Sequence, residues 1–191
     1  DLAGEVERDR RLLHRPVAAV EFFGEKREIQ VAAAALLTVI SAMIDENNAQ
    51  RVEKWVKEAL DAGATLLCGG KRNGRFYEPT VLTNTNNKMK VNAEEVFGPV
   101  VCIEKYNGDI EEAVDMVNDT RFGLQCGIFT DSVRELDFAF RHLEVGGVIH
   151  NDVPTLRFDQ MPYGGVKDSG LGREGVRYAM MDMLEARVLV K

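Results

Sequence analysis

Segments with the composition of strands alternate with helix-like segments along the second half of this chain. After Pro99 the order is strand, helix, strand, helix, strand: "VVCIEKY", residues 109–118, "CGIFT", residues 132–143 and "GGVIHN". Parallel neighbours in a sheet need crossover connections, and helices of about ten residues supply them. The alternation therefore predicts an α/β fold with a mostly parallel sheet and flanking helices.

A second region with regular patterning precedes this alternation. Asp45 and Glu46 are typical of a helix start, the apolar residues that follow recur at helical spacing, and Gly63 is typical of a helix end. Next, "ATLLCGG" predicts a short buried strand, and "RFYEPTVLTN" predicts a second extended segment whose Pro79 favours an edge position. We expect these two segments to pair with each other.

The two ends of the chain differ from its middle. A final helix is predicted at about residues 173–184, and the β-prone tail "ARVLVK" follows it without a neighbouring strand in the sequence. We expect this tail to add to a distant sheet or to a partner subunit, which would make the protein a homo-oligomer. Residues 1–40 show no clean amphipathic periodicity, so no elements are predicted there. The expected division is residues 1–40, an α/β portion at 41–185, and an oligomerisation strand at 186–191.

Charge and hydropathy exclude two classes of partner. The chain carries 24 Lys and Arg against 31 Asp and Glu, a net charge of -7, which is opposite to the basic surface of a nucleic-acid-binding protein. Its longest apolar run, residues 31–40, is too short to span a bilayer, and the charged first residues do not resemble a signal peptide. We therefore expect a soluble, cytoplasmic protein that binds neither nucleic acid nor membrane.

The cysteines and histidines show no pattern of a metal site. Cys68, Cys102 and Cys126 are widely spaced, and His14, His142 and His150 lack the spacing of paired ligands. No metal is predicted. The cysteines fall in or beside predicted strands, where buried, inert thiols in a reducing compartment are the expectation.

Three glycines near the C-terminus have the spacing of a dinucleotide-binding loop. Gly170, Gly172 and Gly175 match G-x-G-x-x-G, but no strand-like run leads into them, and too few residues follow to supply the acidic residue that holds a ribose. We interpret the glycines as a close-packed loop before the last helix.

The same stretch nevertheless carries a family resemblance. "MPYGGVKDSGLGREG" resembles the P-[FY]-G-G-x-K-x-S-G-x-G-R-E segment of aldehyde dehydrogenases, and "EEVFGPVV", "VNDTRFGLQCGIFT" and "GGVIHND" resemble three further segments in the order of that superfamily. The resemblance runs from about residue 42 to 191. It implies the C-terminal part of the catalytic domain and the end of the oligomerisation arm of an enzyme that oxidises aldehydes to acids with NAD or NADP. "NDVPTLRFDQMPYGG" is similar to the lactaldehyde and phosphonoacetaldehyde dehydrogenase branch, whose substrates are short and polar or anionic.

The resemblance assigns two residues to the cofactor. Glu95 would accept hydrogen bonds from the hydroxyls of the nicotinamide ribose, which suits a carboxylate because it has only acceptors. Phe97 would contact the nicotinamide. The tripeptide alone favours a solvated charge pair at Glu94 and Glu95 and a core aromatic at Phe97, and the four motifs together favour the cofactor roles.

Three more residues receive roles in the same way. Asn151 would support the active-site loops through its side chain, unless it is an ordinary turn residue at a strand end. Tyr163 would line the substrate tunnel, or else be a packed loop aromatic. We hypothesise that Arg157 binds an anionic substrate; the alternative is a surface Arg paired with Asp159.

One essential residue departs from the family pattern. "LAGEVERDRR" places Glu7 where A-G-[QE]-x-C has the nucleophilic cysteine, and a carboxylate cannot replace a thiolate in this chemistry. No catalytic residue is assigned. The nucleotide-binding half, the general base and the oxyanion-hole Asn would precede residue 1, and the resemblance is lost over residues 7–40. The chain is therefore expected to be inactive alone, with no cofactor bound.

Two alternatives to an aldehyde dehydrogenase portion remain from the sequence. One is a truncated, non-enzymatic homologue that acts as an oligomerisation or interaction module through "ARVLVK". The other is a cysteine hydrolase that uses Cys126 with His142 or His150, although no nucleophile elbow is present.

Overall fold

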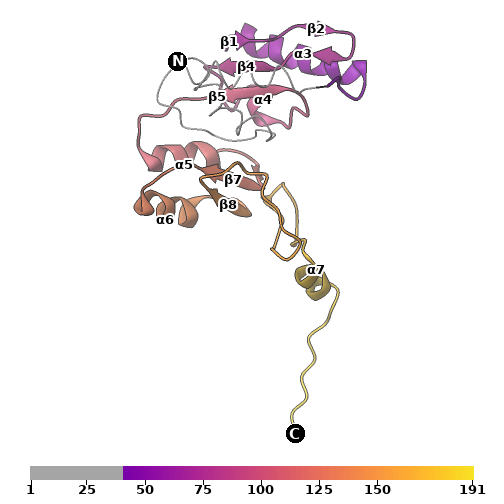
Figure 1. The fold of residues 1–191 in the computed structure, drawn as a ribbon, viewed down its shortest axis with the longest axis vertical. Coiled ribbons are helices and arrows are strands. Elements are labelled where there is room, and N and C mark those ends of the chain that lie inside the picture. Colours follow the sequence, from indigo (N-terminus) through magenta and orange to yellow (C-terminus); the bar gives the residue numbers. More distant parts are fainter. Residues whose placement is uncertain (1–40) are drawn as a thin grey trace, which may run out of the picture. The chain divides into compact units, whose positions relative to one another are not determined.

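The computed structural model describes residues 41–191, which fall into two compact units at residues 41–107 and 108–191 (Figure 1). The predictions for residues 1–40, including the position of Glu7, lie outside the described residues. The first unit contains α3 (Glu46–Asp61), β1 (Thr65–Cys68), β2 (Arg72–Asn73), β3 (Phe76–Tyr77), β4 (Thr80–Thr83), α4 (Lys90–Ala93) and β5 (Val100–Ile103).

Helix α3 supplies the apolar face on which the first unit is built. The side chain of Asp45 caps it by accepting a hydrogen bond from the Asn48 amide at 2.7 Å, as expected for an N-cap aspartate. Its buried residues recur at helical spacing, so one stripe faces the core. That core contains Val52, Val56, Ala59, Ala64, Tyr77, Leu82, Met89 and Val91.

The connections determine the strand directions in the first sheet, whose order is β1-β4-β5. Only the β2–β3 hairpin separates β1 from β4, and these two strands are antiparallel. Helix α4 lies between β4 and β5, which are parallel, with Thr80 opposite Val100. Parallel neighbours require such a crossover, whereas antiparallel ones do not. The sheet is therefore mixed.

The predicted local pairing of "ATLLCGG" with "RFYEPTVLTN" is confirmed, but two details were wrong. Strand β4 is central and not at an edge, because Pro79 immediately precedes the strand and removes no hydrogen bond from its ladder. Strand β1 is largely exposed and not buried: Leu66 and Leu67 keep 38% and 47% of their surface. Strand β1 lies at the edge of the sheet, so only β4 pairs with it, whereas β4 has a neighbouring strand on each side.

The second unit has two parallel strands joined through a helix. It contains α5 (Ile110–Asn118), β6 (Phe122–Gly123), β7 (Gln125–Ile128), α6 (Val133–His142), β8 (Gly147–His150), β9 (Val166–Lys167) and α7 (Val176–Asp182). Strands β7 and β8 pair in parallel, with Cys126 opposite Val148, and α6 is their crossover. Helices α5 and α6 pack together around Val114, Ile128 and Ala139 (Figure 1).

Lys167 joins the loop after β8 to the end of α5. Its Nζ donates to the carbonyl oxygens of Asn118 at 2.8 Å and Thr120 at 3.1 Å, and lies 2.6 Å from Glu144 Oε2. Strand β9, which contains Lys167, pairs antiparallel with β6. A cation at the carbonyl end of a helix is electrostatically favourable. These contacts hold the backbone at β9 against the end of α5 and β6.

The interpretation of the glycine motif as a packed loop agrees with the structure at Gly175. This residue has φ 105°, and a Cβ there would lie 2.6 Å from the Met161 carbonyl oxygen. Only glycine tolerates both conditions. The final helix is shorter than predicted, since it begins at Val176 and ends at Asp182.

The observed fold is α/β with several small sheets, of which the three-stranded one is mixed, so the expectation of one mostly parallel sheet was too simple. Residues 184–191, which the structure describes, form no helix or strand. Val188, Leu189 and Val190 are each more than 80% exposed there. The oligomerisation strand at 186–191 stays a prediction.

Candidate functional site

The loop at residues 94–99, between α4 and β5, is attached to α3 at two points. Arg51 Nη2 donates a hydrogen bond to the Val96 carbonyl oxygen at 2.7 Å. Gly98 packs so closely that a Cβ there would lie 2.7 Å from Val52 Cγ2. Val96 itself packs against the core of the unit. The loop backbone is therefore held by both a polar and a steric contact.

This attachment leaves two side chains in solvent. Phe97 is 78% exposed, and its φ of 43° is unusual for a residue with a side chain. Phe97 is thus not a core aromatic. Glu95 is exposed as well, and the described residues give its carboxylate no hydrogen-bond or ion-pair partner. Its exposure agrees with either interpretation of the glutamate, a ligand contact or a solvated charge.

A second group of side chains meets in the second unit. Arg157 Nη2 lies 2.6 Å from Glu174 Oε2, and the Arg157 guanidinium carbon lies 4.7 Å from the centre of the Tyr163 ring. The backbones of Tyr163 and Glu174 form an antiparallel bridge. Glu174, and not Asp159, is therefore the ion-pair partner of Arg157, because the bridge places residue 174 beside the ring on which the guanidinium stacks.

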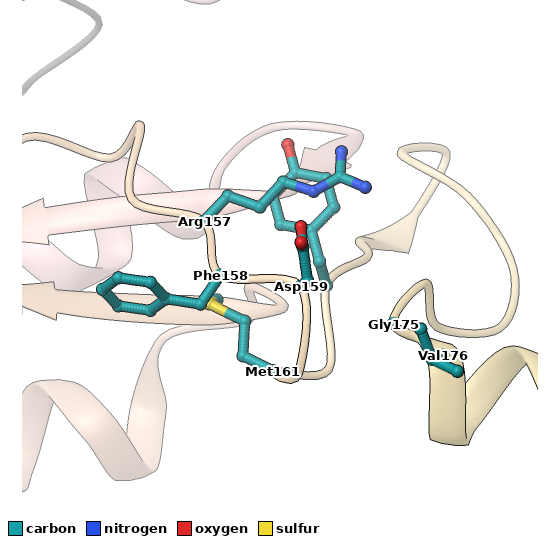
Figure 2. A pocket seen from close by; sticks show the side chains of 7 residues that line it. Arg157, Phe158, Asp159, Met161, Gly175 and Val176 are labelled. Carbon is teal, nitrogen blue, oxygen red and sulfur yellow. The ribbon is translucent and has the colours of Figure 1, made fainter.

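Arg157 and Tyr163 border a hollow of about 210 Å³. One loop contributes Arg157, Phe158, Asp159 and Met161, and the start of α7 contributes Gly175 and Val176 (Figure 2). The wall also includes Tyr163. The hollow thus combines aromatic and thioether surface with one guanidinium and one carboxylate, which suits a small ligand with a charged end.

Asn151 follows β8 with φ 54°, in the left-handed region. Its Oδ1 accepts a hydrogen bond from the Thr130 amide at 3.0 Å, and its own amide donates to the Ile128 carbonyl at 2.7 Å. Asparagine tolerates this conformation better than most residues. Asn151 therefore joins the carboxyl ends of β7 and β8 through its side chain.

The thiols of Cys102 and Cys126 are poor nucleophiles. Burial raises the pKa of Cys126 to about 11, and burial likewise raises the pKa of Cys102 to about 11. His142 Nδ1 lies 2.8 Å from the Phe138 carbonyl oxygen, and His150 Nε2 lies 2.8 Å from that of Thr130. These geometries oppose a cysteine hydrolase, which needs an accessible thiolate beside an imidazole.

Sequence reasoning missed two residues that shape these sites. Arg51 holds the loop at residues 94–99, and its i,i+4 spacing from Trp55, whose ring it covers at 4.7 Å, was visible on the helix. Glu174 stands in the quoted C-terminal motif, but its contact with Arg157 depends on a backbone bridge that no spacing rule indicates.

The described part of the chain contains no group of three or more His, Cys, Asp or Glu that could hold a metal ion. Within those same residues, no helix combines the length and apolar character needed to cross a membrane.

Comparison with known proteins places these features in a family. Residues 20–189 match the model of the aldehyde dehydrogenase family. The 3-sulfolactaldehyde dehydrogenase of Priestia aryabhattai is 52% identical over 153 residues, which are 80% of this chain and 32% of that protein. The crystal structure of aldehyde dehydrogenase 21 from Physcomitrella patens, in complex with the reaction product succinate, aligns with a TM-score of 0.80 and 48% identity, covering 87% of this chain and 37% of that one.

A further structural match is the glyceraldehyde-3-phosphate dehydrogenase GapN of Methanocaldococcus jannaschii, complexed with NADP. It aligns with a TM-score of 0.73 and 36% identity, covering 84% of this chain and 38% of that one. The chain therefore belongs to the aldehyde dehydrogenase family. The match begins at residue 20, earlier than the boundary near residue 42 that the motifs indicated. The chain spans about a third of the length of these relatives.

Proposed function

We propose that this chain supplies a cofactor-contacting loop and a substrate-contacting hollow to an NAD(P)-dependent aldehyde dehydrogenase acting on short, polar or anionic aldehydes. The observation that carries the proposal is the loop at residues 94–99. Its backbone is attached to α3 through Arg51 and Gly98, while Glu95 and Phe97 are presented to solvent. A loop that exposes an aromatic ring on a supported backbone is typical of a ligand contact.

The two exposed side chains fit the nicotinamide end of NAD(P). The carboxylate of Glu95 offers only acceptors, as two ribose hydroxyls require, and the ring of Phe97 offers a flat face to the nicotinamide. When bound, the cofactor supplies the hydride acceptor. The residues of this chain would hold and orient the ribose and the ring, which favours reaction by fixing their position.

The hollow in the second unit is suited to the other reactant, the aldehyde substrate. Arg157 can donate several hydrogen bonds to an anionic group, and Tyr163 gives the guanidinium an aromatic surface to lie on. Two of the similar proteins are associated with anionic compounds: one is named for 3-sulfolactaldehyde, and the crystal structure of the other contains the reaction product succinate. Asn151 would support the loop beside this site by holding Thr130.

The 191-residue chain is proposed to be inactive by itself. The buried thiols of Cys102 and Cys126, with pKa values raised to about 11, are unsuited to attack an aldehyde. Glu7 would stand at the position of the family's nucleophile and cannot form a thioester.

A chimera tests this function directly. The 153 residues that match the 3-sulfolactaldehyde dehydrogenase would replace their counterpart in that enzyme, which keeps the remaining two thirds or so of its own chain. A short anionic aldehyde is supplied as the substrate, and the formation of reduced nicotinamide is then measured. We expect turnover. We expect Glu95→Gln to raise the KM for the cofactor about tenfold, because the substitution weakens one or two charge-assisted hydrogen bonds to the ribose.

Asp61→Asn is the matched control, because it removes one exposed carboxylate from the same unit, at the end of α3. It should leave the KM for the cofactor unchanged. A folded chimera without turnover, or a cofactor KM that Glu95→Gln and Asp61→Asn change equally, would contradict the proposed function.

A second candidate is an oligomerisation module, favoured by the exposed apolar tail around Val188, Leu189 and Val190. An exposed β-prone segment can add to the sheet of a second copy. Light scattering should then report dimers or larger homo-oligomers for the 191-residue chain and monomers after deletion of residues 186–191. Monomers in both cases would count against this candidate.

A further inference from the structure

Asparagine is followed by glycine at two places in this chain, Asn73–Gly74 and Asn107–Gly108. Such a pair is chemically labile, because a glycine has no Cβ to keep its backbone nitrogen away from the side-chain carbonyl carbon of the preceding asparagine. Neither pair has a role in the proposed function. The structure places the two pairs in different surroundings, so we expect them to differ in reactivity.

The first pair belongs to the β2–β3 hairpin, which several contacts hold closed. Asn73 lies in the ladder between the two strands, and Tyr77 of β3 is buried in the core. Arg72 Nη1 donates to the Gly74 carbonyl oxygen at 3.0 Å, and Arg72 Nε donates to Glu53 Oε2 at 2.7 Å. Ring closure between Asn73 and Gly74 changes the backbone of both residues, so the hairpin must open before they react.

The second pair lies between β5 and α5, in a segment that forms no helix or strand, and both of its residues are exposed. Gly108 has φ 88°, and a Cβ built there would have no heavy atom within 4 Å beyond its chain neighbours. Among the residues that the structure describes, none accepts a hydrogen bond from the N–H of Gly108. The nitrogen that must react is therefore accessible without the opening of a ladder.

We propose that Asn107 is a site of spontaneous deamidation in the folded protein, and that the hairpin protects Asn73 from the same reaction. The Gly108 nitrogen loses its proton and attacks Cγ of Asn107. The new C–N bond closes a five-membered succinimide, and the side-chain nitrogen leaves as ammonia. Water then opens either carbonyl of the ring, which gives aspartate or isoaspartate. The net change is the gain of one water and the loss of one ammonia, without oxidation or reduction.

This modification alters the chain immediately before α5. Both products add a negative charge next to Asp109, and isoaspartate also inserts the β-carbon of the former asparagine into the backbone. Asp109 is the N-cap of α5, and its side chain accepts a hydrogen bond from the Glu111 amide at 3.0 Å. Isoaspartate is also the substrate of methyltransferases that esterify its free α-carboxylate, so the aged chain becomes a substrate for that class of enzyme.

The test follows both asparagines in the full 191-residue chain. The chain is incubated at mildly alkaline pH, in buffer and in parallel in denaturing guanidinium chloride. Peptide mapping by mass spectrometry measures the conversion of each asparagine, and an isoaspartyl methyltransferase measures isoaspartate. In denaturant, both pairs should react at similar rates. In buffer, Asn107 should stay within about tenfold of its rate in denaturant, and Asn73 should react at least about tenfold more slowly than Asn107.

Three variants separate the effect of the fold from that of the dipeptide. Asn107→Gln should remove most of the isoaspartate formed in buffer, because glutamine would have to close a larger ring. The matched Asn73→Gln should leave that amount nearly unchanged. Arg72→Met removes the contacts of Arg72 with Gly74 and Glu53, so it should speed the conversion of Asn73 in buffer without changing that of Asn107.

Two results would overturn the inference. If Asn73 converts in buffer less than about tenfold more slowly than Asn107, the hairpin does not give the protection expected of a closed ladder. If Asn107 converts in buffer more than about tenfold more slowly than in denaturant, the fold protects that pair as well. The proposed function is unaffected by either result, because the chimera assay tests it separately.

Discussion

Arg51 lies on helix α3 and donates a 2.7 Å hydrogen bond to the carbonyl oxygen of Val96, forty-five residues further along the chain. The same guanidinium covers the ring of Trp55 at 4.7 Å. One side chain therefore connects the surface of the helix to the loop that presents Glu95 and Phe97.

Replacing Arg51 should loosen this loop. We expect Arg51→Ala to lower the free energy of unfolding by about 1 kcal/mol, the usual effect of losing one hydrogen bond, and to speed amide exchange at residues 94–98. Hydrogen-exchange mass spectrometry measures the second effect. Lys54→Ala is the control, because Lys54 is 72% exposed and, among the residues that the structure describes, pairs only with Glu58, at 3.9 Å. Equal exchange at residues 94–98 in both variants would contradict the role of Arg51.

Gly98 should not tolerate a side chain. A Cβ there would lie 2.7 Å from Val52 Cγ2, and Val52 is fully buried, so Gly98→Ala is expected to cost about 1–3 kcal/mol of stability. Urea denaturation measures this cost. In the background of Val52→Ala the clash disappears, and the added cost of Gly98→Ala should fall by at least half. Strictly additive costs would show that the two residues do not meet.

Lys167 should contribute more to stability than an exposed cation. Lys167→Met leaves the carbonyl oxygens of Asn118 and Thr120 without their donor, for an expected loss of about 2 kcal/mol in thermal or urea unfolding. Arg141→Met is the control in the same unit. Arg141 is 67% exposed and pairs with Asp137 one helical turn away, a contact worth little. A loss for Lys167→Met no greater than that for Arg141→Met would refute this account.

Stability should fall as the pH rises from 9 toward 11. The fold raises the pKa of Cys126 from 9.0 to about 11, so the unfolded chain releases this proton at a lower pH than the folded chain. The stabilisation is complete below pH 9 and is lost as the pH approaches 11, with an upper limit of about 2–3 kcal/mol.

The measurement for this effect is urea denaturation at several alkaline pH values. Cys126→Ala should show a shallower decline than the native chain. Cys68→Ala is the control, since Cys68 is less buried. In a parallel experiment, iodoacetamide at neutral pH should modify Cys68 well before Cys126. If the stability of the Cys126→Ala variant falls with pH as steeply as that of the native chain, the predicted contribution of Cys126 is wrong.

The sequence was most informative where the signal is local. The side chains of Asp45, Asp109 and Ser132 cap α3, α5 and α6, and these helices begin one residue after the caps. Strand pairing depends on partners distant in sequence. The central position of β4, and with it the mixed character of the sheet, was therefore not evident from a proline and a run of apolar residues.

The candidate site shows the same difference between local signals, which the sequence carries, and contacts between residues distant in sequence, which it does not. Family motifs identified Glu95, Phe97, Asn151, Arg157 and Tyr163, whose roles stay predictions. The alternative that paired Arg157 with Asp159, two residues away, named the wrong carboxylate, because sequence reasoning favours near neighbours. The backbone bridge between Tyr163 and Glu174 places a more distant carboxylate there instead.

The parallel pairing of β4 with β5 limits how this protein can change. The chain must travel back along the sheet between these strands, and residues 84–99 make that return with Glu95 and Phe97 at its end. A deletion that removed the loop would also shorten the return path and separate the two strands. The length of the segment is therefore constrained by the sheet itself, in addition to any constraint from the side chains that it carries.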